Sequence, residues 1–401
     1  MEIKKLARFF RTIFTNFLRT LPISSEVLGP PKDFYKTTWN WVYNSKIGNN
    51  KDQGSIVSIY PKYKFSRCPP KTIEDQVHWQ FEREYQHESP ETFVAVIPEG
   101  RVWGNNGTVI APDDKFLADL SIEFGSSESE HSILRQWQLP YVHYINGTVA
   151  VLSAVGGDRY FHWMFDVLPR IHLLKSAGVD KDCVDKFCVN GLDYPFQRET
   201  LSVLGIPEKK IIESCKFPHI KAKKLVVPSL PGDTGNMPNW ACEFLKKEFM
   251  RSNIPVSKLG KREFIYISRA NASYRRVLNE PDVVKFLQKF GFKVVALELI
   301  SVAEQALLLS SASVVVAPHG AGLSNLVFCQ PGTKVVELFS PNYVNVCFWA
   351  CSDQVGLDYY YLIGEGQRPD EYIDPHAVRE DILVNINSLA ELMKCAGIIS
   401  V

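Results

Sequence analysis

The sequence predicts an α/β protein built from two packed units, each with a β-sheet covered by helices. Its 401 residues are 45% hydrophobic and 22% charged, which is typical of globular proteins. This length exceeds the roughly 250 to 300 residues at which a single hydrophobic core stops growing. Short β-branched runs alternate with helical patterns along most of the chain, and this alternation indicates βαβ units with parallel strands.

Composition excludes several other classes of protein. The 45 Lys and Arg residues nearly balance 44 Asp and Glu residues, so we expect no nucleic-acid partner. Nine cysteines without a CxxC pair argue against a disulfide framework or a zinc ribbon, and we expect buried free thiols at Cys347 and Cys351. No apolar run reaches the roughly 18 residues of a membrane span, and no cleavable signal is evident. A cytoplasmic location follows as an expectation.

Residues 1–22 have the pattern of a basic amphipathic helix. Apolar residues recur at spacings of three and four up to Pro22, and five basic residues accompany a single acid. Such a helix can lie on an anionic membrane surface, which would hold the protein at the inner face of a membrane. The alternative, a helix docked on the protein's own core, stays open. The basic residues are Lys4, Lys5, Arg8, Arg11 and Arg19.

The next segments lead into an N-terminal domain. Residues 23–70 are rich in Pro, Gly, Asn and Lys, which predicts an irregular linker. Residues 71–235 form the expected N-terminal α/β domain. Within it, short alternating runs separated by turn residues over 92–125 predict a small antiparallel β element. Helices at 160–177 and 195–204 and strands at 186–190 and 224–227 are expected to follow it.

A turn-rich break at 228–238 precedes the expected C-terminal domain, 236–375. Four β-branched runs separated by helical patterns predict one doubly wound sheet in this domain. Residues 376–401 form a tail with a helix at 389–395. The predicted strands are 264–268, 293–297, 313–317 and 334–338, and the predicted helices are 239–252, 280–290, 302–310 and 322–328.

A buried strand runs directly into His319-Gly320-Ala321-Gly322, where a helix is expected to begin. Glycines leave backbone N–H groups at a helix start free to face an anion, and a diphosphate fits there. Glu337, near the end of the next strand, can accept hydrogen bonds from ribose hydroxyls. The alternative is that the glycines only permit close helix packing.

A second motif places Ser268 and Arg269 at the end of the first strand of the same sheet. A planar guanidinium binds two phosphate oxygens at once, so Arg269 is a candidate diphosphate ligand. Arg275 or Arg276 can assist, although at least one of this pair is expected to be solvated.

The third motif contains His162 and Asp166, which share one helix face because they are four residues apart. A His–Asp pair beside the indole of Trp163 suits deprotonation of a sugar hydroxyl. A buried histidine satisfied by its carboxylate, or two metal ligands, are the alternatives. No third metal ligand can be assigned.

Missing motifs also restrict the function. Asp180-Lys181-Asp182 is the only Asp-x-Asp. Metal-dependent sugar-nucleotide enzymes place this motif after an apolar strand, and no such strand precedes it here. The motifs of P-loop, zincin and serine-hydrolase proteins are absent, and no GxGxxG follows a strand.

The three motifs together make the chain similar to glycosyltransferase family 61. The matching pieces are FHWMFDVLPR, YISR with RRVLNE, and APHGAGLSNLVFCQPGTKVVELF, in that order. The resemblance spans about residues 92–365. It implies a GT-B-like fold, in which two Rossmann-like α/β domains face a cleft.

The resemblance also implies sugar transfer from a nucleotide diphosphate donor, expected to be a UDP-sugar, to a glycan hydroxyl. Inversion without a metal or other cofactor is expected, in capsular or similar polysaccharide synthesis, with a lipid-linked glycan as a possible acceptor. Asp166 is the expected base, with His162 as its partner or rival, and Trp163 and Arg170 are expected at the acceptor. A sugar-nucleotide-modifying enzyme and an inactive assembly scaffold are the alternatives. The expected donor-site residues are Ser268, Arg269, Arg275, His319, Gly320, Ala321, Gly322, Leu323, Asn325 and Glu337.

Overall fold

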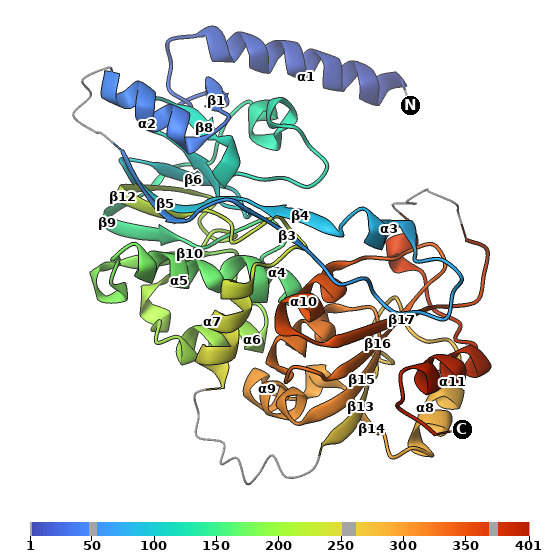
Figure 1. The fold of residues 1–401 in the computed structure, drawn as a ribbon. Coiled ribbons are helices and arrows are strands. Elements are labelled where there is room, and N and C mark those ends of the chain that lie inside the picture. The colour runs from blue at the N-terminus through green and yellow to red at the C-terminus, as the bar shows by residue number, and fades with distance from the viewer. Residues whose placement is uncertain (1, 48–53, 251–261, 369–375, 401) are drawn as a thin grey trace. The chain divides into compact units, whose positions relative to one another are not determined.

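The computed structural model describes residues 2–47, 54–250, 262–368 and 376–400 (Figure 1). The chain divides into two compact units. Unit 1 comprises residues 1–62 and 90–231, and unit 2 comprises residues 63–89 and 232–401.

Unit 1 contains a ten-stranded mixed sheet in the order β1-β8-β7-β6-β12-β9-β10-β11, to which β5 adds through β12 and β2 adds through β5. The long β12 joins the two kinds of pairing, because it is antiparallel to β5 and β6 and parallel to β9. The strands are β1 (Asp33–Tyr35), β2 (Ser55–Tyr60), β5 (Thr92–Pro98), β6 (Arg101–Trp103), β7 (Thr108–Ile110), β8 (Lys115–Leu117), β9 (His143–Val151), β10 (Lys186–Val189), β11 (Ile211–Glu213) and β12 (His219–Pro228).

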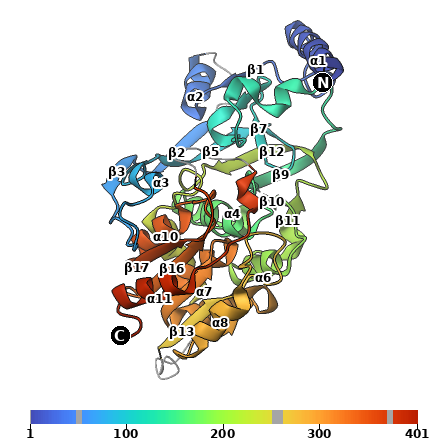
Figure 2. The same ribbon diagram turned by 90° about the vertical axis from the view of Figure 1, so that its right-hand side faces the viewer.

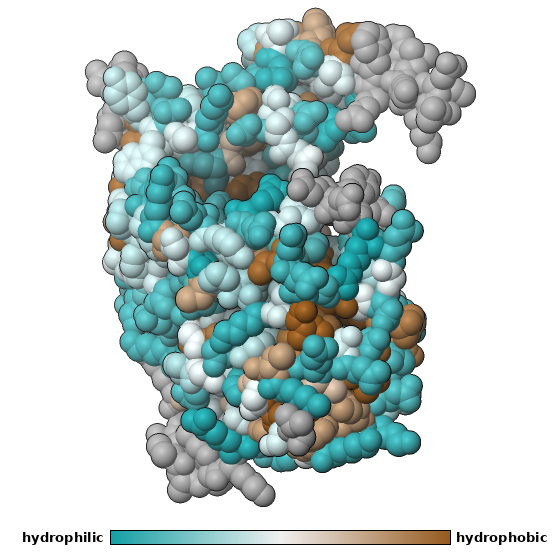
Figure 3. Space-filling model, turned by 45° about the vertical axis from the view of Figure 1, so that its right-hand side comes forward, coloured by the Kyte–Doolittle hydropathy of each residue, from teal (hydrophilic) through white to brown (hydrophobic). Residues whose placement is uncertain are grey.

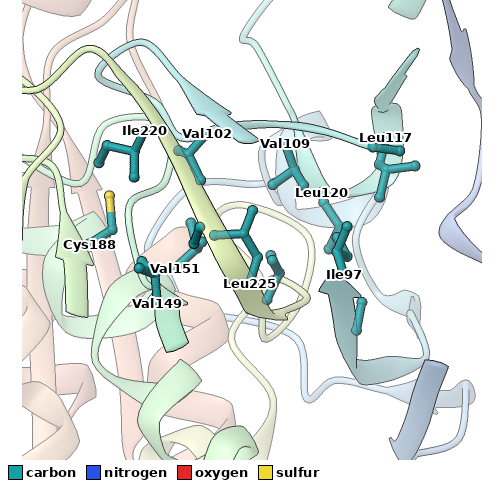
Figure 4. Packing of buried hydrophobic residues seen from close by; sticks show 14 of the residues in the cluster. Ile97, Val102, Val109, Leu117, Leu120, Val149, Val151, Cys188, Ile220 and Leu225 are labelled. Carbon is teal, nitrogen blue, oxygen red and sulfur yellow. The ribbon is translucent and has the colours of Figure 1, made fainter. Parts of the chain in front are cut away.

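The antiparallel hairpins expected over 92–125 form, since β6 pairs with β7 and β7 with β8. They are part of the large sheet rather than a separate small element. Alternating apolar residues on the strands explain this, because they bury one continuous face. Figure 4 shows part of that core, with Ile220 and Leu225 from β12 packing near Val102, Val149 and Val151.

Part of the segment 23–70 is regular, which differs from the irregular linker expected from composition. Strands β1 and β2 add to the sheet of unit 1 through β8 and β5. Helix α2 (Thr38–Ile47) buries Trp41 and Val42 in the same core. Short strands of this kind depend on partners distant in the sequence, so local composition does not reveal them.

The expected helix over 160–177 is present but irregular. It begins as α4 (Tyr160–His162), continues as a π-helical turn over Trp163–Val167, and ends as α5 (Pro169–Ser176). Pro169 lacks an amide N–H, and a wider turn before it is one way to accommodate that loss. Helix α6 (Pro195–Val203) follows at the expected place.

Unit 2 contains a parallel five-stranded sheet in the order β14-β13-β15-β16-β17. The expected doubly wound organisation is therefore present in this unit. All four predicted strands form, and a fifth strand extends the sheet. They are β13 (Glu263–Ile267), β14 (Lys293–Val295), β15 (Ala312–Pro318), β16 (Lys334–Phe339) and β17 (Asp358–Ile363).

Helices cover both faces of this sheet (Figure 2). One face packs against α8 (Glu280–Gln288) and α11 (Ile386–Cys395), which contribute Leu287 and Leu392 to the core. The other helices of the main part of unit 2 are α7 (Asn239–Phe249), α9 (Val302–Ser310) and α10 (Cys347–Val355). The predicted end of the first of these helices, 251–252, lies outside the described residues.

Residues 63–89 belong to unit 2, although the sequence places them in the linker and the N-terminal domain. They form the β3 (Tyr63–Ser66) and β4 (Gln86–Ser89) hairpin and the short helix α3 (Trp79–Glu82). Phe81 is fully buried and its ring centre lies 4.7 Å from that of Tyr361. This aromatic contact anchors the segment to the five-stranded sheet.

Helix α1 (Glu2–Thr20) forms at the N-terminus. Its last turns dock on unit 1, since Thr15 and Leu18 are buried and Arg19 donates to the carbonyl of Lys32 at 2.8 Å. Phe14 and Phe17 on the same helix are exposed. Among the described residues, no helix combines the length and apolar character needed to cross a membrane.

Candidate active site

One cluster of candidate residues lies in unit 2, at the carboxyl ends of β13 and β15. The strand order reverses here, because β14 pairs with one edge of β13 and β16 pairs with the far edge of β15. Doubly wound sheets bind ligands at this reversal point. Ser268 and Arg269 follow β13, and His319 and Gly320 follow β15, so the fold brings two of the predicted motifs together.

Arg269 lies directly against the backbone of Gly320. A β-carbon at position 320 would lie 2.0 Å from Nη1 of Arg269, so only glycine leaves room for the guanidinium. Nε of Arg269 donates to the carbonyl of Arg275 at 3.2 Å, and Nη2 donates to the carbonyl of Tyr274 at 3.0 Å. These bonds fix the guanidinium without neutralising its charge.

Arg275 adds a second cation under unusual constraints. Its φ of 55° is left-handed, which a long side chain rarely adopts. Its guanidinium carbon lies 4.9 Å from the ring centre of Tyr274 and 5.3 Å from that of Tyr343. Nε of Arg275 is buried and has no hydrogen-bond partner in the described part of the chain. Backbone strain and an unpaired buried donor together favour a ligand-binding role.

The neighbouring Arg276 has a different environment. It is exposed, and its Nη2 lies 2.7 Å from Oδ2 of Asp381 in an ion pair. The structure thus assigns the solvated position of this pair to Arg276. Burial lowers the pKa of Arg269, and the charge of Arg275 lowers it further. The guanidinium groups of Arg269 and Arg275 thus act on each other electrostatically, and two such neighbouring cations indicate a site for an anion.

The helix predicted over 322–328 is present as a 3-10 helix, Ala321–Phe328, directly after Gly320. The N–H of Leu323 donates to the carbonyl of Gly320 at 2.9 Å. No hydrogen bond within the described ranges engages the N–H of Ala321 or Gly322. The amides of Ala321 and Gly322 are therefore available to an anion, whereas that of Leu323 is engaged.

Two polar residues of the predicted donor site bond to the protein itself. Nδ2 of the fully buried Asn325 donates to Oε1 of Gln305 at 2.7 Å and to the carbonyl of Gly322 at 3.0 Å. Oγ of Ser268 donates to Oε1 of Glu280 at 2.9 Å. Asn325 thus shapes the loop that carries the free amides.

Glu337 is fully buried, which differs from the predicted contact with ribose hydroxyls. Its Oε1 lies 2.5 Å from Nδ1 of His319, and its Oε2 accepts from the hydroxyl of Tyr359 at 2.5 Å. Side chains alternate along a strand, so Glu337 points away from the face that carries α8 and α11. Both carboxyl oxygens are engaged inside the protein.

The His162–Asp166 pair lies in unit 1. Nδ1 of His162 and Oδ2 of Asp166 are 2.7 Å apart, which confirms that the two side chains meet across one helical turn. The side chain of His162 is 15% exposed and that of Asp166 is 7% exposed. Burial raises the pKa of Asp166, whereas the hydrogen bond from His162 and the charges of His162 and Arg170 lower it. With Nδ1 engaged, Nε2 is the ring nitrogen of His162 left for a substrate.

A glycine and two aromatic rings hold the imidazole of His162. Gly156 has a φ of +71°, and a β-carbon there would lie 2.7 Å from Cδ2 of His162. The ring centres of Phe124 and Phe161 lie 5.5 and 5.2 Å from that of His162. Gly156 therefore supplies both a left-handed turn and the space that the ring occupies.

Trp163 and Arg170 are buried, which differs from the predicted contact with an acceptor. Nε1 of Trp163 donates to Oγ1 of Thr200 at 2.8 Å, and the residue has no exposed surface. Nη1 of Arg170 donates to the carbonyl of Ser153 at 2.8 Å, and burial lowers the pKa of Arg170 to about 10. Both side chains support the core beneath the His–Asp pair.

Sequence reasoning missed three residues around these clusters: Gly156, Tyr343 and Tyr359. Gly156-Gly157 directly before the His162 helix is a local signal that could have marked the first. The tyrosines carry no such signal, because only the fold brings them to Arg275 and Glu337. As for metals, the described ranges hold no group of three or more His, Cys, Asp or Glu side chains placed to bind an ion.

Comparison with known proteins identifies a family match over part of the chain. Residues 160–336 match the model of the family described as Glycosyltransferase 61, which confirms the resemblance over that region. This stretch carries the His162–Asp166 pair, the arginines and the His319 loop, so the matched region is that of a glycosyltransferase.

A single stretch also resembles a curated protein. It is 33% identical over 99 residues to protein O-linked-mannose beta-1,4-N-acetylglucosaminyltransferase 2 of Tetraodon nigroviridis. The stretch covers 24% of this chain and 17% of that protein, so the chain spans much less than the relative's full length.

Proposed function

We propose that this protein transfers a sugar from a nucleotide diphosphate donor, with UDP as the nucleotide, to a hydroxyl of a glycan. The observation that carries the proposal is the pair of guanidinium groups at the reversal point of the unit 2 sheet. Arg269 lies against Gly320, and Arg275 has a buried N–H that finds no partner among the described residues. The match to the glycosyltransferase 61 family supports the same chemistry. A GT-B-like architecture remains part of the proposal.

In this proposal the donor diphosphate binds Arg269, Arg275 and the amides of Ala321 and Gly322. Fixed cations and N–H groups stabilise the charge that develops on the departing diphosphate, a contribution worth several kcal/mol in a site shielded from water. The guanidinium groups can supply the positive charge that a divalent metal supplies in other transferases. We therefore propose metal-independent transfer, and chelation by EDTA should leave turnover intact. Inactivation by EDTA that Mg²⁺ or Mn²⁺ reverses would contradict it.

The proposed base is the His162–Asp166 pair, with His162 as the group that takes the proton. Asp166 is the more buried partner and binds Nδ1, which leaves Nε2 to accept the acceptor's hydroxyl proton. The resulting oxygen attacks the anomeric carbon and the diphosphate leaves from the opposite face, which inverts the configuration. The assignment of His162 as the base differs from the sequence-based expectation that Asp166 is the base.

Donor binding and transfer can be tested separately. A panel of nucleotide sugars should reveal a donor by thermal shift of the full chain. We expect Arg269→Ala to lose that shift, whereas His162→Ala and Asp166→Asn keep it and lose transfer. Arg276→Ala is the matched control, because this neighbouring arginine is paired with Asp381. No shift with any nucleotide sugar, or full turnover by His162→Ala, would refute the corresponding assignment.

We also propose that α1 holds the enzyme on an anionic membrane surface, where lipid-linked acceptors of cell-surface polysaccharides lie. Ile13, Phe14 and Phe17 are 50%, 50% and 57% exposed on a helix rich in basic residues. Figure 3 shows brown hydrophobic residues at the top of the view, where α1 lies in Figure 1. Exposed rings beside cations suit the headgroup region of a bilayer.

Vesicle sedimentation tests the membrane proposal without disturbing the docked residues Thr15 and Leu18. We expect Phe14→Ser with Phe17→Ser to reduce partition onto phosphatidylserine vesicles by about tenfold. Tyr141→Ser, which alters a side chain that is 95% exposed, is the control and should bind like the parent. Equal binding of all three proteins would refute the proposal.

A further inference from the structure

Three buried side chains form a continuous hydrogen-bonded chain beside the arginines of unit 2. Tyr359 donates its hydroxyl proton to Oε2 of Glu337 at 2.5 Å, and Oε1 of Glu337 lies 2.5 Å from Nδ1 of His319. The side chains of His319 and Glu337 are 5% and 0% exposed. The imidazole also stacks on Phe339, with ring centres 5.3 Å apart. The ring is therefore held in one orientation, and Nε2 is its remaining polar atom.

The burial of these three side chains determines which of their atoms carry protons. Burial raises the pKa of Glu337 to about 8, partly offset by the hydroxyl of Tyr359 and the charge of Arg275. Burial also lowers the pKa of His319 far below its usual value, and the cations Arg275 and Arg269 lower it further. Near pH 7 both partners are therefore uncharged. Tyr359 donates to Oε2, so the acid proton of Glu337 lies on Oε1 and is donated to Nδ1 of His319.

A neutral imidazole that accepts at Nδ1 must carry its own proton on Nε2. We propose that Glu337 and Tyr359 are positioning residues that fix His319 as an Nε2–H donor to an anionic oxygen of the donor diphosphate. This inference rests on the proposed function. It replaces the ribose contact expected of Glu337 with an indirect role through His319.

The hydrogen-bonded chain of Tyr359, Glu337 and His319 also changes its proton positions with pH. Once Glu337 loses its proton, the carboxylate accepts a hydrogen bond from Nδ1–H, and Nε2 becomes an acceptor that cannot bond to a phosphate oxygen. The folded pKa of about 8 sets the range, so the N–H donor is present below pH 8 and is lost as the pH rises through it. The other titratable or charged groups that act on His319 and Glu337 are Arg269, Arg275, Tyr343, Cys347 and Tyr359.

The first experiment needs no ligand. In full-length protein labelled with ¹³C-histidine, the Cδ2 shift of His319, assigned by its loss in His319→Gln, distinguishes the two tautomers. We expect Nε2–H at pH 7 and a change to Nδ1–H above pH 8. Glu337→Gln should keep Nε2–H throughout, because its amide can donate to Nδ1 at every pH. Nδ1–H at pH 7, or the same titration in Glu337→Gln, would overturn the inference.

Tyr359→Phe tests how the hydroxyl of Tyr359 affects the pH at which the tautomer of His319 changes. The hydroxyl of Tyr359 lowers the pKa of Glu337, so its removal should move the tautomer change to higher pH. Glu263→Gln is the matched control, because Glu263 lies in β13 at the opposite, amino end of the sheet and pairs with Lys293. It should titrate like the parent. A shift to lower pH in Tyr359→Phe would contradict the proton assignment.

The second experiment measures the dissociation constant of UDP by calorimetry between pH 7 and pH 9.5. We expect UDP to bind the parent about tenfold more weakly at the highest pH than at pH 7, because one charge-assisted hydrogen bond is lost. Dividing the dissociation constant of UDP for the parent by that for Glu337→Gln at each pH removes the effect of the titration of UDP itself. A constant ratio would overturn the link to the donor. Absence of UDP binding in every protein, with the expected tautomers, would instead refute the proposed function.

Discussion

Gly320 shows how a single missing β-carbon can define a binding group. The guanidinium of Arg269 occupies the space that any other side chain at position 320 would need. The φ of Gly320 is 174°, so its backbone conformation is open to other residues, and the requirement for glycine comes from the contact alone.

Gly320→Ala should therefore weaken donor binding by displacing Arg269. We expect the dissociation constant of UDP to rise roughly ten- to a hundredfold, the usual value of a bond to a charged group. The measurement is a double-mutant cycle with Arg269→Ala. The double variant should bind about as weakly as Arg269→Ala alone, and additive losses would show that the two residues act independently.

At His162, Gly156 allows a similar test with a matched control. Both Gly156→Ala and Gly178→Ala introduce a side chain at a left-handed φ, +71° and +77°, but only the first meets another atom within 4 Å. Gly178→Ala should lose about 1 kcal/mol of stability in chemical denaturation, and Gly156→Ala at least as much. Gly156→Ala alone should lose transfer activity, because it displaces the imidazole. Equal activity of the two variants would argue against a role for His162.

At the scale of elements, unit 2 is predicted far better from sequence than the beginning of the chain. The runs that form β13, β15 and β16 are apolar and mostly buried, and this pattern is strong locally, whereas β14 is an exposed edge strand. Strands β1 and β2 exist because distant strands pair with them, so composition alone suggested a linker. The π-helical turn over Trp163–Val167 and the 3-10 helix over Ala321–Phe328 were likewise beyond a periodicity argument, since both follow the expected helical pattern in sequence.

Helix α11 gives a stability prediction for unit 2. Leu392 is fully buried against the five-stranded sheet, so Leu392→Ala should lower the free energy of unfolding by about 2 to 5 kcal/mol. Leu383 is 42% exposed, and Leu383→Ala should change it by less than about 0.5 kcal/mol. Urea unfolding of both variants measures the difference. A small loss for Leu392→Ala would mean that α11 does not belong to the core.

For the whole molecule, the cysteines report on burial in both units. All nine are free, and the predicted buried thiols at Cys347 and Cys351 are confirmed. Burial raises the pKa of Cys188 and of Cys329 to about 12, which suppresses their thiolate forms. Iodoacetamide should therefore label the native protein only at the exposed thiols, and label every cysteine after denaturation. Intact mass and peptide mapping distinguish these results; native labelling of a buried thiol would contradict the packing. The exposed thiols are Cys68, Cys183, Cys215 and Cys395.

The sequence by itself determined the α/β class, the alternation of strands and helices, and the motifs that carry polar residues. These features are local, because periodicity and turn residues act over a few positions. The tertiary structure alone decided that Arg269 lies on Gly320, that Arg275 rather than Arg276 joins the cluster, and that Glu337 is buried against His319. The physical reason is that strand order and the two-residue alternation of each strand set which distant side chains meet, and neither is written in a local pattern.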